Sequence, residues 1–289
     1  MKALAIRIMQ ASDLDFAARC TDAEGWPSET RSELEGFFEH DTEGCFLALL
    51  NSRPIGMGIA TSHGECGFIG EIIVLPEERG RGVGRVILDH AVRYLLGKGC
   101  RSISLDGVVK AVPLYERAGF RKVCRSCRFY GHFSGRMQQR TLHPNVRHMT
   151  EADLVKVLRL DRDAFGADRS FFLLRRFRMH PELCHIFVQS MDVYGYLFGR
   201  RGNHLVSFGP WYCDSHVSFP AALLQNAAAE VEGMRIGVGV LETNGNAIEC
   251  IRSIGLEERP DPPWRMVLGQ VDRLGMSERL YAIGSAATG

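Results

Sequence analysis

The sequence of 289 residues lacks several features that would place it in a special class of protein. It has no apolar run of about 20 residues, the length needed to cross a bilayer. Charges interrupt residues 1–7 before the apolar core of a secretory signal can form. The 35 lysines and arginines balance the 34 acidic residues, so no overall basic charge favours nucleic acid. We therefore expect a cytoplasmic protein with no membrane and no nucleic-acid partner.

Paired cysteine motifs for metal binding are also missing. The nine cysteines are an odd number spread along the chain, which indicates reduced thiols rather than a disulfide framework. Cys124 and Cys127 have CxxC spacing, but no second pair exists to complete a zinc ribbon. No metal-ligand spacing connects His180, His185, His204 and His216. We therefore expect no metal.

The chain does contain a weak internal repeat. Residues 6–14 can be laid over residues 146–154, and both read as a short strand followed by a capped helix. Two later landmarks, a glycine-containing strand and a glycine that ends a short helix, recur in the same order at a similar shift. Three ordered landmarks at a nearly constant shift predict a duplicated domain.

The limits of the two copies follow from the segment between them. Residues 131–144 contain two glycines and a proline and lack periodicity, which is typical of a linker. We expect domains over residues 1–135 and 146–270, with a tail over 271–289. Antiparallel strands come first and a strand–helix–strand–helix run follows. This order predicts a mixed α/β fold, a mostly antiparallel sheet flanked by helices and duplicated in tandem.

A glycine-rich loop, Arg79-Gly80-Arg81-Gly82-Val83-Gly84-Arg85, joins an expected strand over residues 67–75 to a helix over 86–96. Glycines let backbone amides approach a ligand, and amides at a helix N-terminus favour an anion. A diphosphate is the natural occupant, with three arginines adding charge. The P-loop pattern is absent, and Arg85 replaces the third glycine of a dinucleotide fingerprint. A solvated glycine turn is the alternative interpretation.

Two motifs together resemble the GNAT N-acetyltransferases. Arg79-x-x-Gly82-x-Gly84, after a Val-Leu-Pro strand end, is similar to their coenzyme A signature. The stretch PLYERAGF at 113–120 is similar to their later helix motif, in which a tyrosine precedes Gly-Phe. The resemblance covers residues 1–135 and implies acetyl-coenzyme A as co-substrate. In one departure, Val108 stands where the family often has asparagine.

The resemblance also implies roles for individual residues. The diphosphate would lie against Arg79, Gly80, Arg81, Gly82, Val83, Gly84 and Arg85. The backbone of Ile73, Val74 and Leu75 would pair with the pantetheine arm like an added strand. Tyr115 would lie near the thioester sulfur and act as the general acid for the leaving thiolate.

The acceptor side carries weaker signals. A primary amine must lose a proton before it attacks a thioester, and Glu71 is the candidate base. The alternative is an exposed strand carboxylate without a catalytic role. His63 and Asp106 are further candidates for the base. Trp26, between two helical segments, and Asp106 are candidates for the acceptor pocket.

The second half lacks the phosphate loop. Residues 213–220 have no alternating glycines, and Asp214 would repel phosphate. Ile251 stands where the first half has Tyr115, whereas Asn244 stands where it has Val108. We therefore expect a degenerate GNAT-like domain that binds no coenzyme A. The whole chain is predicted to acetylate a small-molecule amine. An acyl-coenzyme A or amine sensor without catalysis, and a protein lysine or N-terminal acetyltransferase, are the alternatives.

Overall fold

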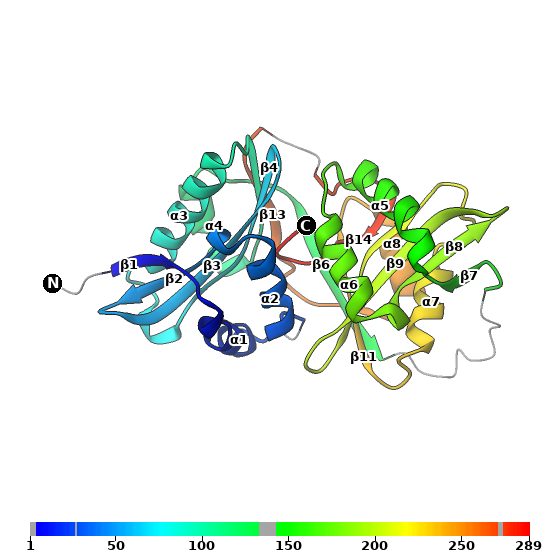
Figure 1. The fold of residues 1–289 in the computed structure, drawn as a ribbon, viewed down its shortest axis with the longest axis horizontal. Helices are drawn as coiled ribbons and strands as arrows, with labels where there is room; N and C mark the ends of the chain where they lie inside the picture. The colour runs from blue at the N-terminus through cyan, green and yellow to red at the C-terminus, as the bar shows by residue number, and fades with distance from the viewer. Residues whose placement is uncertain (1–3, 27, 133–142, 271–273) are drawn as a thin grey trace. The chain divides into compact units, whose positions relative to one another are not determined.

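The computed structural model describes residues 4–26, 28–132, 143–270 and 274–289. It contains two compact units (Figure 1). Unit 1 comprises Met1–Val123, Trp264–Asp272 and Ala286–Thr288, and unit 2 comprises Cys124–Pro263, Arg273–Ser285 and Gly289.

Unit 1 is built on a mixed sheet. Its spatial strand order is β1 (Leu4–Ile8), β2 (Cys45–Leu50), β3 (Arg53–His63), β4 (Cys66–Val74), β5 (Ser102–Gly107) and β13 (Trp264–Gly269). Neighbours are antiparallel, except the parallel pair β4 and β5. The helices are α1 (Leu14–Ala23), α2 (Arg31–His40), α3 (Val83–Gly97) and α4 (Val112–Arg117). Helix α3 packs closely on β3, because a Cβ on Gly58 would lie 2.7 Å from Ile87.

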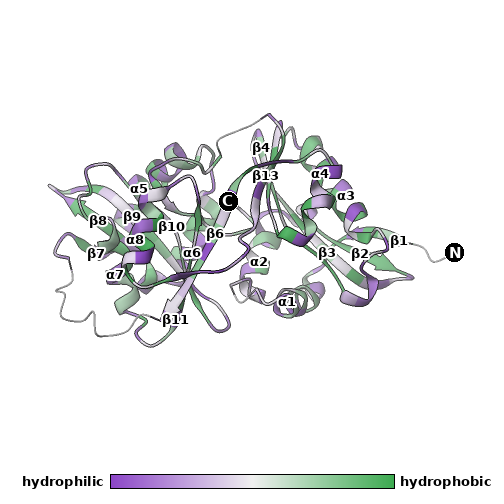
Figure 2. Cartoon of the chain, turned by 180° about the vertical axis from the view of Figure 1, so that it is seen from behind, coloured by the Kyte–Doolittle hydropathy of each residue, from purple (hydrophilic) through white to green (hydrophobic). Residues whose placement is uncertain are grey.

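Unit 2 repeats this arrangement. Its spatial strand order is β6 (Arg121–His132), β11 (Arg235–Leu241), β10 (Val206–Cys213), β9 (Asp192–Arg201), β8 (His185–Gln189) and β7 (Val146–His148). Two short strands join it: β12 (Glu257–Glu258) pairs with β6, and β14 (Leu280–Ala282) pairs with β10. The helices are α5 (Glu151–Phe165), α6 (Ser170–Met179), α7 (Ala221–Ala229) and α8 (Gly245–Ser253). Hydrophobic residues concentrate on strands of both units, for example β2 and β8 (Figure 2).

The predicted duplication is confirmed, including at side-chain level. Arg7 forms two hydrogen bonds to the carboxylate of Asp13, at 2.6 and 2.9 Å. Arg147 forms the same two bonds to Asp153, both at 2.8 Å. Each pair joins the first strand of a copy to the start of its first helix. The mixed, mostly antiparallel sheet with flanking helices is confirmed in both units as well.

The compact units differ from the sequence-based domains in their last strands. Strand β6 follows α4 in the chain, but from Cys124 onward it belongs to unit 2, where it pairs with β11. Strand β13 follows α8, but it pairs with β5 of unit 1 along its whole length. Hydrophobic alternation identifies a strand without naming its partner, so the limits 1–135 and 146–270 do not describe these units.

The expected tail over 271–289 contains ordered structure. Strand β14 pairs with β10 of unit 2, and Ile283 donates from its backbone to Gly239 of β11 at 2.9 Å. Ala287 is fully buried. The glycine- and alanine-rich composition that indicates a tail here permits close packing instead.

Candidate active site

The glycine-rich loop leads directly into the N-terminus of α3. Gly80 and Gly82 have positive φ angles of 76° and 80°, and a Cβ on either would meet no atom within 4 Å. No side chain caps the helix. The amides of residues 80–84 donate to no acceptor in the described part of the chain. Five consecutive free donors at the positive end of a helix dipole form an anion-binding site.

The arginines of this loop are each held by a carboxylate. Arg81 pairs with Glu78 at 2.8 Å and Arg85 with Asp89 at 2.8 Å. Arg79 pairs with Glu24 and donates from Nε to the Val74 carbonyl at 2.9 Å. These ion pairs offset much of the positive charge that the sequence predicts for the loop. Anion binding here therefore depends first on the backbone amides.

Strand β4 bends just before the loop. Its ladder with β3 is interrupted where Glu71 and Ile72 oppose the single residue Gly58, which is a β-bulge. Glu71 takes a positive φ of 53°, an uncommon conformation for a residue with a side chain. A bulge bends its strand and increases the local twist.

Strands β4 and β5 part at this bulge. They pair only from Cys66 and Ser102 to Ile69 and Leu105. Ile73 and Val74 remain paired with β3, and no other described strand pairs with them. The unpaired edge of β4 thus offers backbone groups to an extended ligand, as an added strand would use them.

The glycine-rich loop and the later helix motif lie next to each other at Gly84. A Cβ on Gly84 would lie 3.6 Å from Leu114 of α4 and 3.8 Å from Val74 of β4. The loop, the end of β4 and the late helix therefore surround one place. Tyr115 follows Leu114 and packs its ring against Gly107, where a Cβ would lie 2.8 Å away.

Tyr115 is 7% exposed, and its hydroxyl has no hydrogen-bond partner among the described residues. Burial raises the pKa of Tyr115 to about 12, so the hydroxyl keeps its proton at neutral pH.

The acceptor-side candidates lie at different places. Glu71 is 4% exposed and lies at the bulge. Glu24, at the end of α1, pairs with Arg79 of the glycine-rich loop and with Lys110, and the half-buried Trp26 follows two residues later. His63 lies opposite Cys66, so about 16 Å of strand separates it from the bulge. His63 is therefore too distant for the role of base.

Asp106 has a different environment from the one expected. It pairs with Arg265 of β13, Oδ1 to Nε at 2.6 Å, and both side chains are 1% exposed. The Arg265 guanidinium also lies over the ring of Phe68, 5.0 Å from its centre. Asp106 is thus enclosed in an ion pair within the sheet. The structure thus gives the Asp106 carboxylate a structural partner, and its expected roles in the acceptor pocket and as the base stay predictions.

Two family models match the chain in succession. The model described as acetyltransferase (GNAT) family matches residues 8–120, and the model described as acetyltransferase (GNAT) domain matches residues 157–282. The chain belongs to the GNAT acetyltransferase family. It is a tandem of two GNAT domains, one for each copy of the repeat.

Relatives agree with this assignment. The chain is 23% identical to the holothin acyltransferase of Pseudoalteromonas sp. (strain SANK 73390), over 89% of this chain and 85% of that protein. It is 29% identical to N-alpha-acetyltransferase 30 of Dictyostelium discoideum, over only 32% of this chain and 55% of that protein.

Solved structures share the fold. A structure from Pyrococcus horikoshii has a TM-score of 0.81 at 23% identity, covering 99% of this chain and 96% of its own. A tandem GNAT protein from the clavulanic acid biosynthesis pathway has a TM-score of 0.62 at 13% identity, covering 93% and 100%.

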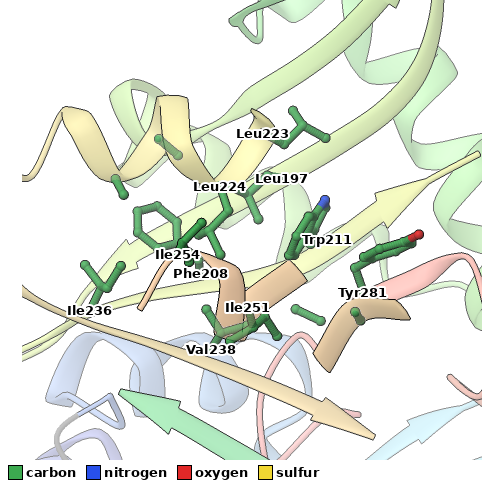
Figure 3. Packing of buried hydrophobic residues seen from close by; sticks show 14 of the residues in the cluster. Leu197, Phe208, Trp211, Leu223, Leu224, Ile236, Val238, Ile251, Ile254 and Tyr281 are labelled. Atoms are coloured by element: carbon green, nitrogen blue, oxygen red, sulfur yellow. The ribbon is translucent and has the colours of Figure 1, made fainter. Parts of the chain in front are cut away.

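In unit 2, the edge that corresponds to the unpaired edge of β4 is paired with another strand. Strands β10 and β11 pair in parallel only from Val206 to Phe208, as β4 and β5 do before they part. Beyond that point β14 pairs with β10 at Trp211 and Tyr212. Tyr281 of β14 packs on Trp211 with ring centres 5.0 Å apart (Figure 3). In unit 2, strand β14 therefore occupies the edge that corresponds to the unpaired edge of β4 in unit 1.

The other counterparts in unit 2 also have structural roles. Ile251 is fully buried and packs beside Val238 in the core (Figure 3). Asn244 caps α8 by accepting from the Ala247 amide at 3.0 Å, and it donates to the carbonyls of residues 278 and 280. Asp214 accepts from the His216 amide at 3.1 Å in the loop that corresponds to the glycine-rich loop of unit 1.

The sequence predicted neither the ion pair of Arg265 with Asp106 nor the pairing of β14 with β10. A lone arginine within an apolar strand, Trp264-Arg-Met-Val-Leu, does indicate a buried acidic partner, and Asp106 is the lone charge of its own strand.

The CxxC cysteines lie three residues apart on the regular strand β6, so their side chains point to opposite faces. Among the described residues, no helix is long and apolar enough to span a membrane.

Proposed function

We propose that unit 1 transfers the acetyl group of acetyl-coenzyme A to the amine of a small-molecule acceptor. The observation that carries this proposal is the run of free amides at residues 80–84, next to the unpaired edge of β4. The two features suit the two ends of one cofactor. The amides suit a diphosphate, and the strand edge suits the amide-bearing pantetheine arm.

In this proposal the loop positions the coenzyme for reaction. The amides of Arg81, Gly82, Val83 and Gly84 bind the diphosphate, and Ile73, Val74 and Leu75 pair with pantetheine. Arg79 and Arg85 flank the phosphates. Acetyl-coenzyme A supplies an acyl carbon activated as a thioester. The backbone amide at the bulge stabilises the oxyanion that develops during attack.

In the proposed reaction Glu71 is the base and Tyr115 donates a hydrogen bond to the leaving group. The amine nitrogen forms a bond to the acyl carbon and the carbon–sulfur bond breaks. Glu71, directly or through water, takes the proton that the amine loses, and the sulfur leaves as a thiolate. Water then protonates the thiolate while Glu71 releases its own proton to solvent, so the protons balance. A thiol has an ordinary pKa of about 8.5, so full transfer from a Tyr115 with a pKa of about 12 is uphill. Tyr115 therefore stabilises the thiolate by donating a hydrogen bond.

A small acceptor fits the surroundings of Glu71 better than a protein chain does. Ala287 lies so close to β4 that a Cβ on Gly70, the residue before Glu71, would be 2.5 Å from it, so the C-terminal segment covers β4 at Gly70. Glu24, two residues before Trp26, pairs with Arg79 of the glycine-rich loop. A relative that matches 89% of the chain is named for holothin, whereas the N-alpha-acetyltransferase matches a third of it.

A thiol-release assay with acetyl-coenzyme A and a panel of small amines, peptides and N-termini tests this function. We expect turnover with small amines and little with peptides. Peptide turnover alone would indicate the protein acetyltransferase. Coenzyme binding without turnover on any acceptor would indicate the sensor.

Tyr115→Phe is expected to lower kcat by about 100-fold while the affinity for coenzyme A changes little. The hydroxyl is removed from the leaving group, but the phosphate contacts remain. Tyr94→Phe is the control, because Tyr94 hydrogen-bonds Asp41 in the same unit away from the loop. Equal losses in both variants would contradict the role of Tyr115.

The pH profile gives an independent measurement. The raised pKa of Tyr115 keeps its proton in place as the pH rises toward about 12. We therefore expect kcat to rise from pH 7 to pH 10 as the acceptor amine deprotonates, without a falling limb near 10. A loss of activity with an apparent pKa near the ordinary tyrosine value of about 10 would contradict this assignment.

A further inference from the structure

Two histidines face each other at the edge of the sheet in unit 2. His148 of β7 and His185 of β8 are direct partners in an antiparallel ladder, so their side chains lie on the same face. Their ring centres are 4.5 Å apart. His185 is 3% exposed, and its Nδ1 is buried without a hydrogen-bond partner among the described residues. Buried polar atoms in native structures are normally satisfied, so an unpartnered Nδ1 is consistent with a ligand at this position.

A carboxylate completes the cluster. Glu230 follows the last turn of α7, which packs against β7 and β8, and its Oε1 lies 3.3 Å from Nε2 of His148. One ligand atom from each of the three residues lies within 4.8 Å of the other two. The cluster is also at the C-terminal, negative end of the α7 dipole, which favours a cation.

The donor set and the spacing match a specific class of ion. Imidazole nitrogens and a carboxylate oxygen are ligands of zinc, at about 2.0–2.2 Å in tetrahedral geometry. Two such ligands lie about 3.3 Å apart, which is the distance between His148 and Glu230. These two side chains are 53% and 43% exposed, so they can rotate to close the remaining gap and leave a fourth position open to water.

We propose that His148, His185 and Glu230 bind a zinc ion that ties the edge strand β7 to the end of α7. The site is separate from the coenzyme loop and does not depend on the proposed acetyl transfer. It differs from the expectation of no metal, which considered sequence spacing alone, because its ligands come from two strands and a helix end that are far apart in the sequence. Tetrahedral His₂Glu coordination suits Zn²⁺, and Mg²⁺, which requires an octahedron of oxygen ligands, does not fit.

Zinc titration of the full chain after treatment with a chelator tests the site. We expect one Zn²⁺ per chain, a higher Tm in its presence and no effect of Mg²⁺. His148→Gln and Glu230→Gln should each weaken Zn²⁺ binding by more than about tenfold and abolish the rise in Tm. Both side chains are half exposed, so both variants should fold, and unfolding without zinc should match that of the unsubstituted chain.

His216→Gln is the matched control. His216 is an exposed histidine paired with a carboxylate, Asp214, in the same unit, but it has no third ligand. It should retain zinc binding. The absence of saturable Zn²⁺ binding, an affinity unchanged in both ligand variants, or an equal loss in the control would each overturn the site.

Discussion

Gly84→Asp is expected to weaken coenzyme A binding by more than a hundredfold while the protein stays folded. Gly84 lies in the first turn of α3 at the end of the run of free amides, and it does not have a positive φ. A carboxylate there would face the diphosphate. Two unit charges about 5 Å apart repel by about 3 kcal/mol at an effective dielectric constant of 20, which corresponds to more than a hundredfold in affinity.

The fold should tolerate this substitution. A Cβ on Gly84 meets Leu114 and Val74 only at ordinary contact distances, and an acidic residue in the first turn of a helix is favourable. Calorimetric titration with coenzyme A measures the affinity, and thermal unfolding measures the fold. Gly97→Asp, an exposed glycine at the other end of α3, is the control and should bind normally. Unchanged affinity in Gly84→Asp would rule out the amide site.

Asp106→Asn is expected to lower the free energy of unfolding of unit 1 by about 3–5 kcal/mol. The substitution leaves Arg265 charged inside the sheet with no anionic partner, and a buried charge without compensation is strongly unfavourable. Equilibrium denaturation measures the loss. Asp89→Asn is the comparison, because the Asp89–Arg85 pair is 44% and 45% exposed and should contribute less than about 1 kcal/mol.

A double variant separates charge from packing. Replacing both partners, Asp106→Leu with Arg265→Met, removes the buried charges together, and buried ion pairs replaced in this way are often neutral. We expect the double variant to regain most of the stability lost in Asp106→Asn. A loss in the double variant as large as in the single one would show that the pair acts through its shape and not its charge.

The sequence reveals local features of the site well. The glycine-rich loop, α3 and the helix of Tyr115 are each specified by neighbouring residues, since glycine conformation and helix periodicity depend on a few adjacent positions. The repeat is visible for the same reason, in the segment from Arg7 to Asp13 and its copy. The free amides follow from the loop because no capping residue precedes α3.

Features that join distant segments could not be read in this way. Asp106 and Arg265 are 159 positions apart, and each looks like an isolated charge in its own strand. The assignment of β6 to unit 2 and of β13 to unit 1 depends on strand pairing, which hydrophobic alternation does not encode. Strand β14 is short and lies in a segment of turn-like composition. Where it pairs with β10, its Tyr281 packs on Trp211, a residue distant in the sequence.

The central claim is that one coenzyme A binds per chain, at residues 80–84 of unit 1. In unit 2, β14 fills the equivalent edge and Asp214 lies in the equivalent loop, so no second site is expected. Calorimetric titration of the purified chain with acetyl-coenzyme A measures this number directly. The structure predicts one equivalent, lost in Gly84→Asp. No binding at high concentration, or two equivalents, would contradict it.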